Sequence, residues 1–242
     1  MKKKITERKS CLDKVIFIFP LVFYLFTEIF RTIDEESYLD FRDEDGIVEY
    51  LTVVFYLIAS YLSFLIAKFY SGKYRGRKLF YLMISALCFF IAMEEISWGQ
   101  RIIGFKSPHF FAEYNNQSEF DIHNFEFVDF DLSSLFDFIF LLICLYGISS
   151  RFILKRKLGE NISVYCPDKT LIFYFILSFL GVFWQFKSIA GYIDLSIMEY
   201  GMEGFNIVLF LFYDPEMAEL LLSMAFLAFV YRNKKIINNS NN

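Results

Sequence analysis

Six apolar runs in this chain are each long enough to cross a lipid bilayer, and they constrain the fold more than any other feature. About 20 helical residues cross the ~30 Å hydrocarbon layer. In the last run, Asp214 is expected to be the N-cap and Pro215 the first helical residue, so that residues 205–213 lie in the interface or dip partway into the membrane. The sequence therefore predicts an all-α, six-helix transmembrane bundle. Its spans lie near residues 15–31, 47–69, 79–99, 132–153, 171–187 and 214–231.

The composition favours one membrane domain over a soluble one. Hydrophobic residues make up 56% of the 242 residues, whereas soluble domains contain roughly 45–50%. No linker rich in Pro, Ser or Gly divides the chain, so residues 1–242 are expected to form a single integral membrane domain. The basic N-terminal run is followed by no small-residue cleavage site, which favours a retained first span over a signal peptide. The four cysteines form no C-x-x-C pair and indicate neither a disulfide framework nor a zinc knuckle.

The distribution of basic residues predicts how the chain is oriented. With the N-terminus inside, the inner segments hold 19 of the 24 Lys and Arg residues and four of the 28 acidic residues. These segments are residues 1–14, 68–78, 151–169 and 232–242. All four agree with the positive-inside rule. The sequence therefore predicts a multi-pass protein of the cytoplasmic (inner) membrane with both termini in the cytoplasm. Its expected partner is the lipid bilayer and not a nucleic acid.

Acidic residues in the predicted spans gather toward the outer side, where the fifth span adds an amide. The acidic residues are Glu28, Glu49, Glu94, Glu95, Asp137, Glu216 and Glu219, and the amide is Gln185. The helix dipole stabilises a carboxylate at the start of a helix, which accounts for Glu49 and Glu216. It opposes one at the end of a helix, where Glu94 and Glu95 are expected, and a charge inside a span costs roughly 2.5–3.5 kcal/mol. Glu94 or Glu95 is therefore expected to line one cavity, open to the outer side, together with Glu49, Glu219 and at least one of Asp137 and Gln185.

The stretch from Glu94 to Arg101 is the richest in reactive side chains. If the helix continues through it, Glu94, Trp98 and Arg101 share a face, and the adjacent Glu95 points about 100° away, so that at least one carboxylate faces the bundle. Both histidines of the chain lie in the loop that follows. Imidazole and carboxylate together suit zinc, iron or manganese, so Glu94, Glu95 and His123 form a candidate site for a divalent metal. The alternative is that His123 is an ordinary surface residue or hydrogen-bond donor.

The loop over residues 105–131 combines side chains in a way that predicts a lid. Seven phenylalanines make it too apolar for a solvated loop, whereas its amides and His123 are too polar to lie wholly in lipid. Both demands are met if this outer loop folds over the bundle, with the phenylalanines packed on the bundle or in the membrane interface and the polar side chains turned toward the carboxylates. Those polar side chains are Asn115, Gln117, His123 and Asn124.

The segment EEISWGQRIIGF, followed by NNQSEFDIHN, resembles segments of uncharacterised bacterial multi-pass membrane proteins. Those proteins carry a similar Glu-Glu-x-Ser-Trp-Gly-Gln-Arg run and a following run with Asn, Gln, Glu and His-Asn, and the stretch EDGIVEYLT resembles them too. The resemblance covers most of the chain and implies no known activity. Two characterised families come near without matching. CAAX-type endopeptidases have Arg where this chain has Gly99, and alkaline ceramidase-like hydrolases bind zinc through three histidines, whereas this chain has two.

The leading functional hypothesis is a membrane-embedded enzyme, with a divalent metal as its candidate cofactor. It would act on a lipid, lipid-linked or membrane-protein substrate at the extracytoplasmic leaflet. Carboxylates in a cavity of low dielectric suit general acid/base catalysis. Glu94 and Glu95 would serve as acid/base or metal ligand and His123 as base or ligand. Arg101 would hold an anionic head group. Substrate contacts are expected from Trp98, Gln100, Asn115, Gln117, Asn124, Glu49, Glu219 and Gln185.

Two non-enzymatic classes stay open at this point. One is a proton- or cation-coupled transporter, since carboxylates in a cavity are also proton and cation sites. The inner halves of the spans contain no Asp, Glu or His, and no inverted repeat is visible, which argues against it. The other is an interaction or receptor subunit, for which the acidic segment 34–45 would provide a binding surface. The sequence alone does not decide whether the protein is an enzyme, and it leaves the oligomeric state open.

Overall fold

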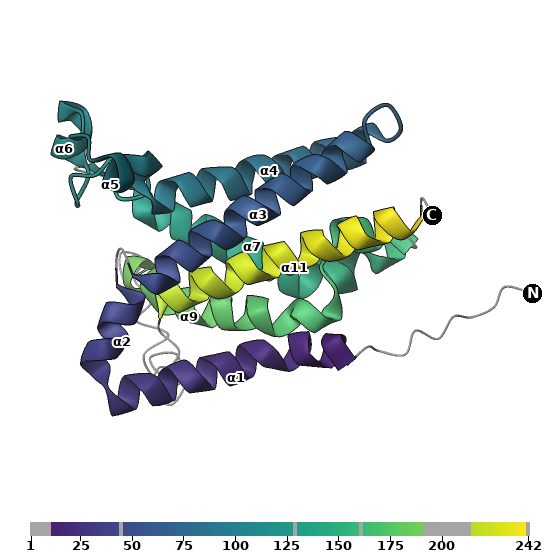
Figure 1. Cartoon of the computed structure of the whole chain (residues 1–242), viewed down its shortest axis with the longest axis horizontal. Helices are drawn as coiled ribbons and strands as arrows, with labels where there is room; N and C mark the ends of the chain where they lie inside the picture. The colour runs from purple at the N-terminus through teal and green to yellow at the C-terminus, as the bar shows by residue number, and fades with distance from the viewer. Residues whose placement is uncertain (1–10, 44–45, 128–129, 160–161, 191–213, 241–242) are drawn as a thin grey trace, which may run out of the picture.

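The computed structural model describes residues 11–43, 46–127, 130–159, 162–190 and 214–240, and its architecture is helical except for one short hairpin (Figure 1). The long helices run roughly alongside one another, and the short elements lie in the connections. The elements are α1 (Cys11–Ile33), α2 (Glu35–Arg42), α3 (Ile47–Phe69), α4 (Arg75–Glu95), η1 (Ser97–Gly99), α5 (Gln100–Ile103), α6 (His109–Tyr114), β1 (Glu126–Phe127), β2 (Phe130–Asp131), α7 (Leu132–Leu158), α8 (Ile162–Tyr165), η3 (Lys169–Leu171), α9 (Ile172–Ala190) and α11 (Pro215–Ser240).

Five stretches of the described chain are long and apolar enough to cross a membrane, so the fold is that of a multi-pass membrane protein. They are Asp13–Ile33, Glu35–Phe69, Arg75–Glu95, Leu132–Lys155 and Ile162–Phe183. The sixth predicted span, in α11, is also a long helix, but it is not among these five. Two carboxylates lie in its first two turns, and Arg232 follows its apolar middle, so charged residues lie on both sides of the apolar stretch. The expectation that residues 205–213 lie in the interface or dip partway into the membrane concerns residues outside those described.

The helix α11 is the centre of the bundle and packs on both α3 and α9. Its side chains from Leu220 to Leu222 and at Ala225 are almost fully buried. Around it, α4 packs mainly on α3, and α7 packs mainly on α9. The helix α1 lies at the periphery and contacts α9 and α2. The bundle therefore consists of two helix pairs, α3–α4 and α7–α9, that share α11 between them.

Each helix pair is held by a close approach at small residues, two serines in one pair and a glycine in the other. In α3–α4, Ser60 Oγ donates to the Ser85 carbonyl at 2.8 Å, and Ser85 Oγ donates to the Ser60 carbonyl at 2.9 Å. Small hydroxylated residues let membrane helices come close and hydrogen-bond across the interface. In α7–α9, the Phe175 ring lies against Gly147, where an added Cβ atom would be 2.2 Å from Phe175 Cδ1. In both pairs a side chain of one helix contacts the other helix closely at these small residues, which leaves no room for larger side chains there.

Polar contacts tie the helices together at both ends of the bundle. At one end, Arg232 of α11 donates to Asp13 of α1 at 3.0 Å. At the other end, Tyr38 of α2 donates a hydrogen bond to Asp214. Asp214 Oδ1 also accepts from the backbone N–H of Met217 at 3.2 Å, and α11 begins at Pro215. The predicted N-cap and first helical residue of α11 are thus confirmed.

The third span was expected near residues 79–99, and the condition that its helix continues through Glu94 to Arg101 is not met. The helix α4 ends at Glu95, and the next turn is distorted by three successive residues with positive φ: Ser97 (46°), Trp98 (53°) and Gly99 (84°). L-residues rarely adopt this left-handed region, and each non-glycine residue there costs on the order of 1–2 kcal/mol. The backbone changes here from right-handed helical to left-handed dihedral angles. Glu94, Trp98 and Arg101 therefore do not follow one helical face.

Candidate functional site

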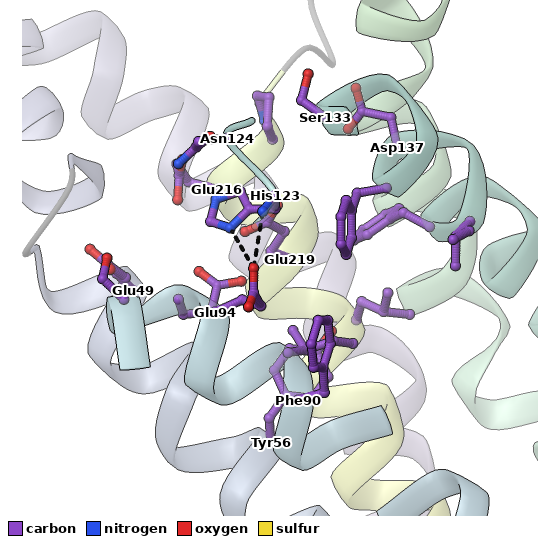
Figure 2. Close-up of a pocket in the computed structure, with 18 of the residues that line it drawn as sticks. Glu49, Tyr56, Phe90, Glu94, His123, Asn124, Ser133, Asp137, Glu216 and Glu219 are labelled. Atoms are coloured by element: carbon purple, nitrogen blue, oxygen red, sulfur yellow. Dashed lines mark hydrogen bonds and ion pairs between the residues drawn. The ribbon is translucent and has the colours of Figure 1, made fainter. Parts of the chain in front are cut away.

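A polar cavity of about 440 Å³ lies at the end of the bundle where α2, α5 and α6 are found (Figures 1 and 2). Its walls come from α3, α4, α7 and α11, and from the loop that follows α5. Seven carboxyl side chains line it, against the two basic side chains Arg101 and His123. The seven are Glu49, Glu94, Glu95, Glu119, Asp137, Glu216 and Glu219. The structure thus brings acidic groups of four different helices into one space, as predicted for Glu94 or Glu95 with Glu49, Glu219 and at least one of Asp137 and Gln185, and the opening to the outer side stays a prediction.

Glu94 connects the last turn of α4 to the loop. Its Oε1 atom accepts from Trp98 Nε1 at 2.6 Å. Its Oε2 atom accepts from the backbone N–H groups of Ile122 at 2.7 Å and His123 at 3.0 Å. The left-handed turn after α4 is what returns the Trp98 indole to this carboxylate, one turn back along the chain. Glu94 is buried, and every one of these donors stabilises its charged form.

Asn115 and Asp121 give the loop its internal structure. Asn115 Nδ2 donates to Asp121 Oδ1 at 2.8 Å, and Asn115 Oδ1 accepts from the backbone N–H groups of Gln117 and Glu119. Asp121 Oδ1 also accepts from the backbone N–H of Asn124 at 3.2 Å, a local turn that Asp residues favour. Both side chains are buried. The loop therefore presents Asp121 and His123 to α4 in a fixed arrangement.

Glu94, Asp121 and His123 form a potential metal-binding cluster. One ligand atom from each of the three lies within 4.8 Å of the others. His123 Nδ1 is buried without a hydrogen-bond partner in the described structure, and it lies 3.6 Å from Glu94 Oε2 and 3.6 Å from Asp121 Oδ1 (Figure 2). Burial by itself would lower the pKa of His123, but the adjacent carboxylates, first that of Glu94, outweigh burial and raise this pKa above its usual value. A positive charge, as a proton or as a metal ion, is therefore stabilised between these groups.

Asp121 is the member of this cluster that sequence reasoning missed. The expected set was Glu94, Glu95 and His123, whereas the close set contains Asp121 in place of Glu95. Glu95 lines the same cavity but is not part of the cluster. An Asp in a turn is expected to bond the backbone nearby, as Asp121 does with the N–H of Asn124, and nothing in the sequence indicated that its carboxylate also lies beside Glu94.

Arg101 is held by two carboxylates, and its expected role as the holder of an anionic head group stays a prediction. Its Nε atom donates to both oxygens of Glu119, at 2.9 and 3.0 Å, and its NH1 atom donates to Glu49 Oε1 at 3.1 Å. Ser97 Oγ donates to the same Glu119 carboxylate. The guanidinium has a planar set of donors that suits such two-sided pairing. Arg101 therefore neutralises part of the acidic cavity and joins α3 to the loop.

The remaining predicted site residues fall into two groups. Gln117 and Asn124 line the cavity and are joined by a hydrogen bond from Asn124 Nδ2 to Gln117 Oε1 at 2.8 Å. Trp98, Gln100 and Asn115 are not among the lining residues and instead support the wall: Gln100, for example, donates to Ser107 at 2.8 Å. The side chain of Gln185 lies outside the described part of the structure.

The phenylalanines of the loop pack mainly on one another. Phe111 contacts both Phe120 and Phe125, with ring centroids 4.4 and 5.0 Å apart. Phe110 and Phe105 extend the cluster, and both are partly exposed. These contacts do not show the expected packing of the rings on the bundle, and the alternative, that the rings enter the membrane interface, stays a prediction. The loop has a small apolar core of its own. It is joined to α4 through Glu94, and to the short elements after α4 through Ser97 and Arg101.

No protein-family model, no curated protein and no solved structure matches this chain.

Proposed function

We propose that this protein is a membrane-embedded, metal-dependent enzyme acting on a lipid, lipid-linked or membrane-protein substrate at the extracytoplasmic leaflet. The observation that carries the proposal is the cluster of Glu94, Asp121 and His123, in which a buried imidazole nitrogen without a partner faces two carboxylates. Two oxygen donors and one nitrogen suit zinc, manganese or iron. Three protein ligands leave a coordination position for water or substrate, as is typical of catalytic metal sites.

The carboxylates beside the cluster supply the acid/base groups of the proposed reaction. A bound divalent metal would activate water or polarise a substrate oxygen. Glu95 and Glu219 line the same cavity as the cluster and come from two different helices. In this proposal, Glu95 accepts a proton from the attacking group, and Glu219 holds or returns it. The loop that carries Asp121 and His123 covers this region and limits access of water, so these groups act at low dielectric.

Metal analysis tests whether His123 contributes a ligand to the cluster, and the second histidine, His109, serves as the control. Purified wild-type protein titrated with Zn²⁺ or Mn²⁺ is expected to bind one ion per chain, and His123→Ala is expected to lose this binding. His109 is 93% exposed and pairs only loosely with Glu113, at 3.5 Å. His109→Ala should therefore bind as the wild type does. Equal metal content in the two variants, measured by plasma mass spectrometry, would rule out the cluster as a metal site.

The proposal also includes six spans with both termini in the cytoplasm. Asp13, Arg151, Asp168 and Arg232 belong to three of the four basic segments, and contacts between them place those segments at one end of the bundle. The elements α5 and α6 lie at the opposite end (Figure 1), and the polar cavity is lined by residues of α5 and of the loop that follows it. Basic segments stay in the cytoplasm, so the cavity would open to the outer side.

Cysteine labelling in intact cells tests this orientation. Asp40→Cys and Glu113→Cys place thiols on exposed residues at the cavity end, and Lys73→Cys places one in the turn between α3 and α4. We expect an impermeant maleimide to label the first two variants in intact cells and Lys73→Cys only after permeabilisation. The unsubstituted protein gives the background from its own cysteines. Labelling of Lys73→Cys in intact cells, with none at Asp40→Cys, would reverse the orientation.

A further inference from the structure

A second cavity, of about 290 Å³, continues from the polar cavity toward the other end of the bundle. Its walls come from α4, α7, α9 and α11, with Tyr165 and Pro167 at its far end. Leu87 of α4 and the α7 residues Ile139 and Ile143 line both cavities, so the two spaces adjoin. The second cavity is lined almost entirely by apolar and aromatic side chains. The two together form a crevice with a polar head and an apolar tail.

The crevice is accessible from the side that faces the membrane. The helices α4 and α7 form its two walls, but α4 packs mainly on α3, and α7 packs mainly on α9. Two of the wall residues on α7 are substantially exposed: Ile139 is 40% exposed and Leu142 is 48% exposed. In a bilayer this surface is in contact with acyl chains. A hydrocarbon chain therefore has a lateral route from the membrane into the apolar tail.

We propose that the crevice binds one hydrocarbon chain of a membrane lipid whose head group lies among the carboxylates of the polar cavity. This inference rests on the proposed function, because it names the class of substrate for the same site. It selects a lipid or lipid-linked substrate over a membrane protein. It also argues against a proton path through the described part of the bundle, since no Asp, Glu, His, Lys or Arg side chain lines the tail of the crevice.

The size of the crevice suits one bound hydrocarbon chain better than a bound peptide helix. Along α4 it runs from Phe80 to Glu94, and at 1.5 Å per residue these 14 steps span about 21 Å. That length is more than half of the ~30 Å hydrocarbon layer. A helix about 10 Å in diameter over the same length would need on the order of 1,600 Å³. The two cavities hold about 440 and 290 Å³, which suits a single flexible chain.

Photo-cross-linking in lipid nanodiscs tests this proposal. The probe is a phosphatidylethanolamine that carries a diazirine near the end of one acyl chain. In the wild type we expect cross-links on α4 between residues 80 and 87 and on α7 between residues 139 and 146. Ile143→Trp fills the junction of the two cavities and should reduce these cross-links about fivefold or more, since a close-packed interior leaves no room beside the larger ring. Leu145→Trp is the matched control, because Leu145 lies on α7, is exposed and lines neither cavity.

The outcomes separate this inference from the proposed function. Loss of the crevice cross-links in Ile143→Trp, with wild-type labelling in Leu145→Trp and an unchanged melting temperature in both, supports the chain site. Equal labelling of the two variants overturns it. Metal binding is measured on the same preparations, and Ile143→Trp should retain it. A protein that binds no metal but gives the crevice cross-links would refute the metal-dependent enzyme and retain the chain site, whereas bound metal without these cross-links would do the reverse.

Discussion

Replacing Arg101 with methionine is expected to lower the free energy of unfolding by about 3–5 kcal/mol, the typical cost of removing one partner from a buried ion pair. The side chains of Arg101, Glu49 and Glu119 are only 15%, 8% and 20% exposed. Without the guanidinium, two largely buried carboxylates from α3 and the loop lose their positive partner in an already acidic cavity. Thermal and denaturant unfolding in detergent micelles measures the difference.

Two comparisons make the Arg101 prediction specific. Arg31→Met breaks the pair with Glu28, which is more exposed and lies one turn away on the same helix, so it should cost less than about 1 kcal/mol. Adding Glu119→Gln to Arg101→Met removes one of the orphaned charges and should restore part of the lost stability. If Arg101→Met and Arg31→Met were equally mild, the two carboxylates would not depend on Arg101.

The second large effect is expected for Glu94→Gln, which should release the loop from the bundle. The glutamine amide has one acceptor oxygen, and its NH₂ group would face either the Trp98 indole N–H or the backbone N–H groups of Ile122 and His123. Hydrogen bonds to a charged group contribute about 1.5–3 kcal/mol each. Local opening of the loop should become easier by about 2–3 kcal/mol, which corresponds to roughly 30- to 150-fold faster amide exchange.

Hydrogen exchange at Ile122 and His123 and limited proteolysis within residues 105–125 measure this opening. Glu95→Gln is the matched control, because it is the same substitution at the next residue and in the same cavity, whereas the loop N–H groups of Ile122 and His123 donate to Glu94. It should leave exchange and cleavage unchanged while impairing the proposed acid/base step. Faster exchange in Glu95→Gln than in Glu94→Gln would contradict the assignment of Glu94 as the residue that docks the loop.

Helical periodicity and end signals predicted the parts of the molecule that depend on local sequence. The N-cap at Asp214 follows from the Asp-Pro pair, and apolar length predicted helices close to those observed. The meeting of Glu49, Glu95 and Glu219 in one cavity was also predictable, because each is costly to expose to lipid and lies near the same end of its helix. These inferences need only the chemistry of single residues and their depth along a helix.

The features that were missed depend on the path of the backbone between helices. Nothing in helix propensity requires Ser97 and Trp98 to adopt positive φ, and this turn is stabilised by contacts that form only when the loop is in place. The pairing of Arg101 with Glu119, and the position of Asp121 beside Glu94, likewise join residues 18 or more positions apart. Side-chain periodicity carries no information on how a loop of this length closes, so neither partner was identifiable in advance.

The serine contacts between α3 and α4, and the Gly147–Phe175 contact between α7 and α9, also determine how the lateral opening can change its width. Because each wall helix is fastened to its own neighbour, neither α4 nor α7 can move away alone without breaking these contacts. Widening requires one pair to slide relative to the other across α11, a shear motion of packed helices. In the described part of the bundle, such sliding keeps the serine contacts and the Gly147–Phe175 contact intact, and the proposed lipid chain would enter between the two pairs.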